Sequence, residues 1–403
     1  MTGRQAGLAA SRRSTALPVS PIRRLMPLAE EAKARGRRVI HLNIGQPDLD
    51  PPPSVMQAAV DATGERLAYA PSRGLPSAVA AWVTYYRHHS IEVEAGDIVI
   101  TGGASEALSL AMLATCDPGD EVLVPEPFYA PYQGIAGVAG LRLVPVPLGP
   151  GFTHPNPEAV RERITPATRA LLICSPSNPT GTVYRREDLI ALGQVARDAG
   201  LFLLSDETYR EIVFDGPPAP SALSIPGLDE HVVVIDSVSK RFNACGLRIG
   251  TIVSRNPAVM AAVADLAELR LAVPVIDQLA VARALAAPEP YIGTVVATYR
   301  ERVAAVVAAL AEIPGVTCHR PGGGFYVVAR LPVDDSERFA AWLLREFALD
   351  GDTVMVTPMS DFYLTPGRGR DEIRIACVHD PATLIRAARV IGAALAAYPG
   401  RTG

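Results

Sequence analysis

The sequence has almost no lysine. Of its 38 basic residues only Lys33 and Lys240 are lysine, and the rest are arginine. Arginine holds a charge or grips a carboxylate at least as well as lysine, but its guanidinium is never deprotonated and cannot condense with an aldehyde. Lys33 also shows that lysine survives here as an ordinary charge on a helix surface. The amine kept at Lys240, inside the polar run 237–243, is therefore the first candidate for covalent chemistry.

Other absences narrow the class of protein. A net charge of −4 and a pI near 6.0 leave no basic surface for a phosphate backbone, so nucleic acid is not expected as a partner. No apolar run is long enough to span a membrane. The five cysteines are odd in number and include no Cys-x-x-Cys pair, which favours a reducing cytoplasm and predicts buried apolar side chains. The seven histidines have no metal-ligand spacing, so no metal site is expected.

Short apolar runs separated by helix-length segments dominate the middle of the chain. The runs that predict strands lie at residues 98–100, 121–124, 170–173, 201–204 and 232–235. This alternation predicts an α/β fold with a mostly parallel sheet that is buried on both faces. A smaller α+β unit is predicted by later segments, which are a helix over 290–313, strands within 322–329 and 372–376, and a helix over 336–349.

The N-terminal part of the chain does not continue this alternation. A helical pattern covers residues 22–37 and leads into a strand-like run at 39–43. We expect this part to pack with the smaller unit. The predicted division is an N-terminal segment at 1–47, a large domain at 48–290 and a small C-terminal domain at 291–403.

Polar residues that follow the apolar runs are the candidates for a site, because ligands bind beyond the carboxyl ends of parallel strands. After 98–100 come small residues, 102–105, that open a helix, whose N–H groups and dipole suit a phosphate. The same residues also serve as ordinary helix caps. After 201–204 comes Asp206, with Tyr209 three residues on. A helix cap is an equally common role for Asp206.

The last of these strand ends carries the lysine. After 232–235 come Ser237, Ser239 and Lys240, and Arg248 stands eight residues beyond. One amine, two hydroxyls and a guanidinium near a glycine-rich helix start would hold a phosphorylated aldehyde, which describes pyridoxal phosphate. Asp206 would then keep the pyridine nitrogen protonated.

Two rival motifs fail on the sequence itself. The Ser237-x-x-Lys240 pattern of penicillin-binding proteins needs a Lys-Thr-Gly elsewhere, and the other lysine is followed by Ala34 and Arg35. A phosphate-binding P-loop needs glycine directly before its lysine, and Ser239 stands there.

From about residue 20 to residue 395 the chain resembles the class I/II aminotransferases, the fold-type-I pyridoxal-phosphate enzymes related to aspartate aminotransferase. The segments that carry the resemblance are 43–48, 69–76, 102–108, 125–129, 175–181, 205–209, 237–250 and 372–375. Their occurrence together in this order is highly specific. The resemblance implies a three-layer large domain with a mostly parallel sheet, and a smaller α+β domain formed by both termini.

The resemblance also implies roles for individual residues. Lys240 forms the Schiff base with pyridoxal phosphate and shuttles the α-proton, and Asp206 pairs with the pyridine nitrogen. The other implied cofactor contacts are Tyr129, Asn178 and Tyr209 on the ring, Gly103, Ala104, Ser105, Ser237, Ser239 and Arg248 on the phosphate, and Tyr69 from a second subunit. The implied contacts to the substrate carboxylate are Gly45, Asn178 and Arg374.

The predicted function is transfer of an amino group from an amino acid to a 2-oxo acid by a cytoplasmic homodimer. Some aspartate-specific relatives carry a lysine where Ser105 stands here, so aspartate is not implied as the substrate. Arg73 and Arg210 belong to motifs shared across the branch and are left unassigned.

Three alternatives are open at this point. The first is a β-lyase, synthase or oxidase built on the same site, because the cofactor site does not fix which bond breaks. The second is a transcription regulator with a degenerate aminotransferase domain, which would need a DNA-binding module ahead of the core. The third is a binding module without catalysis, against which the full set of polar residues argues.

Overall fold

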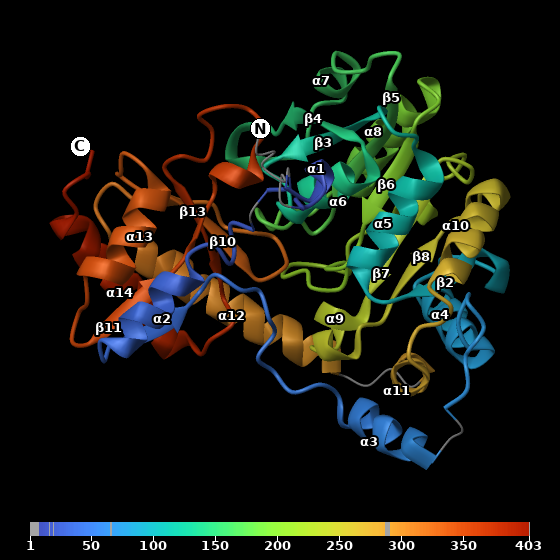
Figure 1. Cartoon of the computed structure of the whole chain (residues 1–403), viewed down its shortest axis with the longest axis horizontal. Helices are drawn as coiled ribbons and strands as arrows, with labels where there is room; N and C mark the ends of the chain where they lie inside the picture. Colours follow the sequence, from blue (N-terminus) through green and yellow to red (C-terminus); the bar gives the residue numbers. More distant parts are fainter. Residues whose placement is uncertain (1–7, 16, 19, 65–66, 287–290, 403) are drawn as a thin grey trace, which may run out of the picture.

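A sheet of seven strands forms the centre of the computed structural model, which describes residues 8–15, 17–18, 20–64, 67–286 and 291–402 (Figure 1). In spatial order its strands are β2 (Ile98–Thr101), β8 (Gly250–Val253), β7 (Val232–Ser237), β6 (Phe202–Asp206), β5 (Thr168–Cys174), β3 (Glu121–Glu126) and β4 (Arg142–Pro147). Neighbours run parallel except where β8 meets β2 and β7. The predicted mostly parallel sheet is confirmed, and β4 and β8 are strands that the sequence did not reveal.

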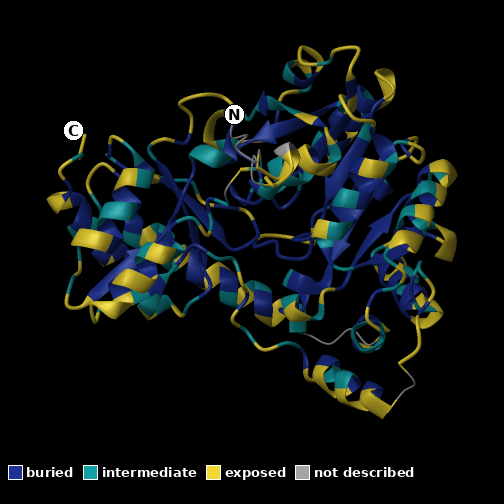
Figure 2. Ribbon diagram, in the orientation of Figure 1, coloured by how far each residue is buried: buried dark blue, intermediate teal, exposed yellow. Residues whose placement is uncertain are grey.

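Helices cover both faces of this sheet. Their bounds are α3 (Pro53–Asp61), α4 (Pro76–His88), α5 (Ala104–Thr115), α6 (Pro131–Ala139), α7 (Pro157–Arg161), α8 (Arg186–Asp198), α9 (Val238–Arg241), α10 (Pro257–Leu269) and α11 (Val275–Ala286). Side chains alternate across a strand, so Leu203 joins the apolar cluster on one face and Leu204 the cluster on the other. Every residue of β2, β3, β7 and β8 is buried, and Figure 2 shows the centre of the molecule in the colour of buried residues. Burial on both faces explains why these strands read as unbroken apolar runs.

The second part of the molecule joins the two ends of the chain. Its strands are β1 (Arg38–His41), β9 (Thr317–Cys318), β10 (Tyr326–Arg330), β11 (Asp352–Met355), β12 (Thr357–Pro358) and β13 (Glu372–Ala376). The order β12-β13-β10-β9 forms an antiparallel sheet, and β1 pairs in parallel with β11. Its helices are α2 (Met26–Ala34), α12 (Tyr291–Ala311), α13 (Ser336–Glu346) and α14 (Pro381–Ala397). Figure 1 shows α2 in blue beside the orange and red elements of the C-terminal half.

The N-terminal segment differs from the predicted helix over 22–37. The helix α2 begins only at Met26, with Pro27 in its first turn, where a fixed φ suits a helix start. The residues before it form a turn in which the Ser20 carbonyl accepts the N–H groups of Arg23 and Arg24. A short helix, α1 (Arg12–Thr15), precedes the turn. The domain boundaries stay a prediction, and residues 1–7 and 287–290 within them lie outside the described residues.

Within the described residues, none of the helices is both long enough and apolar enough to cross a membrane.

Candidate active site

A cavity of about 530 Å³ lies at the carboxyl ends of the parallel strands, between the central sheet and the part formed by the chain ends. Asp206 ends β6 and Ser237 ends β7, while Arg374 comes from β13 on the opposite side. The structure brings most of the predicted site residues to this cavity, namely Gly45, Ala104, Ser105, Tyr129, Asn178, Asp206, Tyr209, Ser237, Ser239, Lys240, Arg248 and Arg374. Gly103 lies just behind its wall. Tyr69 does not line it and is 84% exposed.

The start of α5 forms one end of the cavity together with Arg248. Gly103 precedes α5 with a φ of 90°, and a Cβ at this position would lie 2.7 Å from the Nη2 atom of Arg248. Arg248 has a left-handed backbone, φ 53°, and its Nη2 donates to the Gly102 carbonyl at 3.2 Å. The hydroxyls of Ser237 and Ser239 lie 2.9 Å apart nearby. Helix start, guanidinium and hydroxyls together offer donors that could hold an anion.

Asp206 forms the floor of the cavity and is almost fully buried. Its Oδ2 accepts from the Tyr132 hydroxyl at 2.6 Å, and its Oδ1 accepts from the Thr208 hydroxyl at 2.7 Å. Burial raises the pKa of Asp206, and these hydrogen bonds offset part of that rise. A positive group of a ligand beside this carboxylate would lower its pKa and favour the charged form. Tyr132 was missed in the sequence, although it lies only three residues after Tyr129, in the first turn of α6.

Arg374 is a fully buried cation that has no carboxylate partner among the described residues. Its Nη1 donates to Asn178 Oδ1 at 2.9 Å, its Nη2 donates to the Asn43 carbonyl at 2.7 Å, and its Nε has no hydrogen-bond partner. The guanidinium carbon lies 4.4 Å from the ring centroid of Tyr326. A buried charge is costly unless it is paired, so this position suits a carboxylate supplied by a ligand.

Two tyrosines complete the wall beside Arg374. The hydroxyls of Tyr209 and Tyr326 lie 3.0 Å apart, and burial raises the pKa of Tyr209 well above its usual value. Tyr326 was missed in the sequence, where it reads only as part of an apolar strand. Its hydroxyl occupies the space that a Cβ at Gly45 would need, so only glycine fits there.

Lys240 reaches the cavity from α9, a helix of one turn. Its Nζ donates to the Gly45 carbonyl at 2.7 Å and lies 5.7 Å from the ring centroid of Phe325. Burial lowers the pKa of Lys240 to about 8. The positive charges of Arg374 and Arg248 add to this shift, and Cys245 opposes it. About a tenth of the amine is therefore unprotonated at pH 7.

The lowered pKa predicts a distinct pH profile for chemical labelling of Lys240 in cofactor-free protein. Only the neutral amine reacts with an aryl fluoride, and a pKa near 8 makes the neutral fraction rise about tenfold from pH 7 to pH 9 and then level off. Mass spectrometry would follow the two lysines in one sample, with the exposed Lys33 as the internal standard. A labelling rate at Lys240 that still climbs tenfold per pH unit beyond pH 9 would contradict the lowered pKa.

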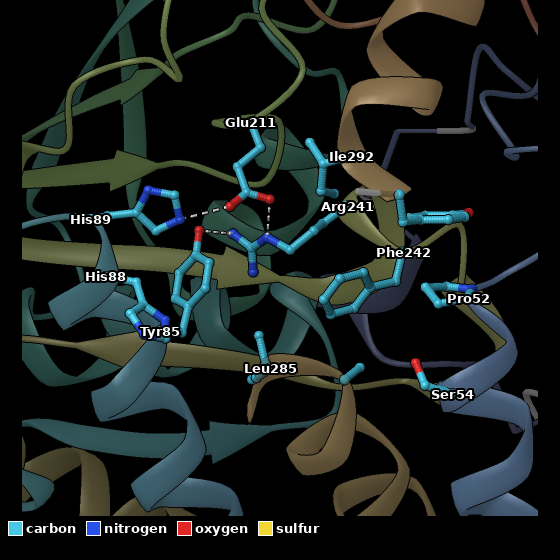
Figure 3. A pocket seen from close by; sticks show the side chains of 12 residues that line it. Pro52, Ser54, Tyr85, His88, His89, Glu211, Arg241, Phe242, Leu285 and Ile292 are labelled. Atoms are coloured by element: carbon cyan, nitrogen blue, oxygen red, sulfur yellow. Dashed lines mark hydrogen bonds and ion pairs between the residues drawn. The ribbon is translucent and has the colours of Figure 1, made fainter. Parts of the chain in front are cut away.

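A buried ionic network holds the turn that carries Lys240 (Figure 3). The adjacent Arg241 donates from Nη2 to Asp236 Oδ2 at 2.9 Å and from Nε to Glu211 Oε2 at 2.8 Å. Glu211 also lies 2.9 Å from His89 Nε2, and Figure 3 shows the Tyr85 hydroxyl bonded to the same guanidinium. Of this network, Tyr85, His89, Glu211 and Arg241 line a second, smaller cavity of about 180 Å³ with largely apolar walls. The network joins the residue before Ser237 to the residue after Lys240.

We expect Arg241→Met to lower the free energy of unfolding by about 3–5 kcal/mol, because it removes the cation that pairs with the buried Asp236 and leaves the buried Glu211 with His89 alone. Arg161→Met is the matched control, since it breaks only an exposed pair with Glu158 and should cost about 1 kcal/mol at most. Equilibrium urea unfolding at one protein concentration measures both variants. A loss below 1 kcal/mol for Arg241→Met would mean that the network does not hold this turn.

Three further arginines are possible residues of the cavity. Arg73 donates to the backbone of Gly96 and Arg210 is bonded to Tyr85, and neither lines the cavity. Arg23, which the sequence did not single out, does line it. Among the described residues, no cluster of histidine, cysteine and acidic side chains could hold a metal ion.

The cysteines only partly fit the prediction of buried apolar side chains. Cys116 and Cys377 are buried, whereas Cys174, Cys245 and Cys318 are partly exposed. Cys174 and Cys245 line the cavity, which explains their exposure.

Comparison with known proteins gives consistent matches over most of the chain. Residues 37–391 match the family described as aminotransferase class I and II. The aspartate aminotransferase of Geobacillus stearothermophilus is 34% identical over 304 residues, which cover 74% of this chain and 77% of that protein. A probable N-succinyldiaminopimelate aminotransferase of Mycobacterium tuberculosis is 35% identical over 362 residues, which cover 85% of this chain and 88% of that protein. The structure of Thermus thermophilus aspartate aminotransferase with maleate has a TM-score of 0.87 at 30% identity, covering 96% of this chain and 100% of that one.

Proposed function

Because the chain belongs to the family of class I and II aminotransferases, we propose that the cavity beside Lys240 is its catalytic site. The chain is a pyridoxal-phosphate-dependent aminotransferase, and it transfers an amino group from an amino acid to a 2-oxo acid. The observation that carries the proposed site is the meeting, in one cavity, of a buried amine with a lowered pKa, a buried carboxylate and a buried guanidinium without a carboxylate partner.

The residues of the cavity fit pyridoxal phosphate at both ends. The pocket of Arg248, Ser237 and Ser239 at the start of α5 would take the phosphate, with the backbone of Gly103, Ala104 and Ser105. Asp206 would hold the protonated pyridine nitrogen, whose charge favours the ionised carboxylate that burial disfavours. The proposed contacts to the ring are Tyr129, Asn178 and Tyr209. Lys240 would hold the cofactor covalently through Nζ.

When bound, pyridoxal phosphate supplies an aldehyde and a ring that withdraws electrons from the substrate. The protein supplies binding and proton transfer. We propose that Arg374 and Asn178 bind the α-carboxylate of the substrate, together with the backbone of Gly45. Lys240 Nζ would take the proton from the substrate α-carbon and return one later, because its pKa near 8 lets it act as both base and acid close to neutral pH.

The test follows the visible absorbance of the loaded enzyme while single amino acids are added without any oxo acid. A transaminase converts the bound cofactor to its aminated form and releases one oxo acid per site. Release of ammonia or a cleaved product instead would indicate a lyase, synthase or oxidase on the same site. The named relatives favour transamination, and none of those reported above belongs to the other group.

We propose that the enzyme works as a homodimer in which Tyr69 reaches the neighbouring subunit's phosphate pocket. Two observations support this proposal. Tyr69 is 84% exposed, and two other apolar side chains close to it in the sequence are also exposed, Leu67 at 66% and Val60 at 62%. Exposed apolar side chains grouped in one stretch of chain are typical of an interface. A sedimentation measurement that gives the mass of one chain under assay conditions would contradict the dimer.

The reducing cytoplasm is the proposed location, in keeping with five free cysteines. Recovery of the native enzyme only from an extracytoplasmic fraction would contradict it.

A further inference from the structure

One positively charged side chain of the cavity has no role in the proposed function. Its charged lining residues are Arg23, Asp206, Lys240, Arg248 and Arg374. In the proposed function the cofactor and the substrate α-carboxylate engage all of these except Arg23. The Arg23 guanidinium has no hydrogen-bond or ion-pair partner among the described residues, and the side chain is exposed.

The backbone on both sides of Arg23 is fixed, although its side chain is free. The Ile22 carbonyl accepts from Asn43 Nδ2 at 2.7 Å. Arg24 forms ion pairs with Glu337 at 2.9 Å and Asp361 at 3.0 Å, both of which lie outside the cavity. Neighbouring arginines thus have opposite roles, since Arg24 anchors the segment and Arg23 faces the cavity.

Asn43 also ties this segment to the proposed α-carboxylate site. Its side chain holds the Ile22 carbonyl, and its own carbonyl accepts from Arg374 Nη2 at 2.7 Å. Asn43 is fully buried. One buried residue therefore links the backbone next to Arg23 to the Arg374 guanidinium, while the Arg23 side chain itself is free to move. Arg23 is also close enough to Tyr129 to oppose the burial that raises the pKa of that tyrosine to about 12.

We propose that Arg23 binds a second carboxylate of the substrate, so that this site takes dicarboxylic amino acids and their 2-oxo acids. The inference rests on the proposed function of the cavity, because it assumes that Arg374 binds the α-carboxylate. A planar guanidinium matches a carboxylate with two parallel hydrogen bonds, which a neutral side chain cannot provide. A substrate with a neutral side chain would take the Arg23 guanidinium out of water without pairing it. This cost would weaken the binding of neutral substrates relative to acidic ones.

The first experiment measures the half-reaction of the loaded enzyme with matched pairs of donors, aspartate against asparagine and glutamate against glutamine. We expect the acid of at least one pair to react about 10- to 100-fold faster than its amide, as a hydrogen bond between charged groups allows. Arg23→Met should reduce this ratio to about one by slowing only the acid. Arg23→Lys, which keeps the charge, should retain most of the ratio.

A matched control removes a positive charge elsewhere. Arg320 is exposed and does not line the cavity, so Arg320→Met should leave the ratio unchanged. General damage to the site would slow acids and amides together, whereas loss of the proposed contact slows only the acids. The two donor lengths show whether a four-carbon or a five-carbon acid fits.

A binding measurement tests the same contact without turnover. Titration calorimetry of the loaded enzyme would compare succinate with butyrate, which has the same chain length and one carboxylate fewer. Arg23→Met should lower the affinity for succinate about 10- to 100-fold and leave the affinity for butyrate unchanged.

The outcomes separate this inference from the proposed function. Donors converted with no preference for acids, or a preference that survives Arg23→Met, would overturn the role of Arg23 and leave the aminotransferase site standing. Failure to convert any donor would overturn the proposed site, and the succinate titration would still decide whether Arg23 binds a carboxylate.

Discussion

Lys240→Arg should lower kcat by about 10⁴-fold while the protein keeps its fold, the upper range for loss of a positioned acid–base group. Arginine preserves the positive charge and most of the side-chain length, but it offers no neutral amine at any working pH. Two functions are therefore lost together, the covalent hold on the cofactor and the proton transfer at the substrate α-carbon. The loss comes from the chemistry of the guanidinium and not from a lost contact, because an arginine can still donate a hydrogen bond to the Gly45 carbonyl.

The chain contains its own control for this substitution. Lys33 is the only other lysine, lies on α2 and forms an exposed pair with Glu30 at 2.8 Å. Lys33→Arg should leave kcat and KM unchanged. The measurements are turnover, circular dichroism and the visible absorbance of protein loaded with pyridoxal phosphate. Normal turnover by Lys240→Arg would exclude Lys240 as the catalytic amine.

The sequence predicted the central sheet well because both of its faces are covered. Full burial requires several consecutive apolar residues, so a strand such as β7 is visible without any neighbour. The short strands β9 and β12 carry no such signal, because two residues have no readable period. The polar residues Asp206 and Ser237 were found for the same reason as the strands, since each ends an apolar run.

The residues that were missed lie where local pattern has another explanation. Arg23 falls within the helix predicted over 22–37 and was not singled out, but the observed helix begins at Met26 and Arg23 lines the cavity from the turn before it. Tyr326 reads as one more apolar residue of β10. Both positions depend on how the N-terminal segment packs against the far end of the chain, and sequence spacing does not record such contacts.

Asp206→Asn should lower kcat by about 10²- to 10³-fold while the cofactor stays bound, the range found when one preorganised charged or polar group is removed. Burial raises the pKa of Asp206, and a neighbouring cation favours its charged form. In the proposed site that cation is the protonated pyridine nitrogen of the cofactor. An amide cannot stabilise that positive charge, so the ring withdraws electrons less effectively. Binding should survive because Lys240 and the phosphate pocket are intact.

Glu207→Gln is the control that separates this effect from the loss of any buried carboxylate. Glu207 follows Asp206 directly and is buried, but it does not line the cavity, and its Oε1 accepts from Ser221 and from the Ala222 N–H. Burial raises the pKa of Glu207 to about 7, so glutamine resembles a form that this side chain already adopts at neutral pH. We expect Glu207→Gln to keep turnover within about threefold, because it touches no reacting group. Equal losses of kcat in the two variants would mean that Asp206 acts by supporting the fold, whereas a loss confined to Asp206→Asn, with the absorbance of bound cofactor retained, would place its carboxylate on the ring nitrogen.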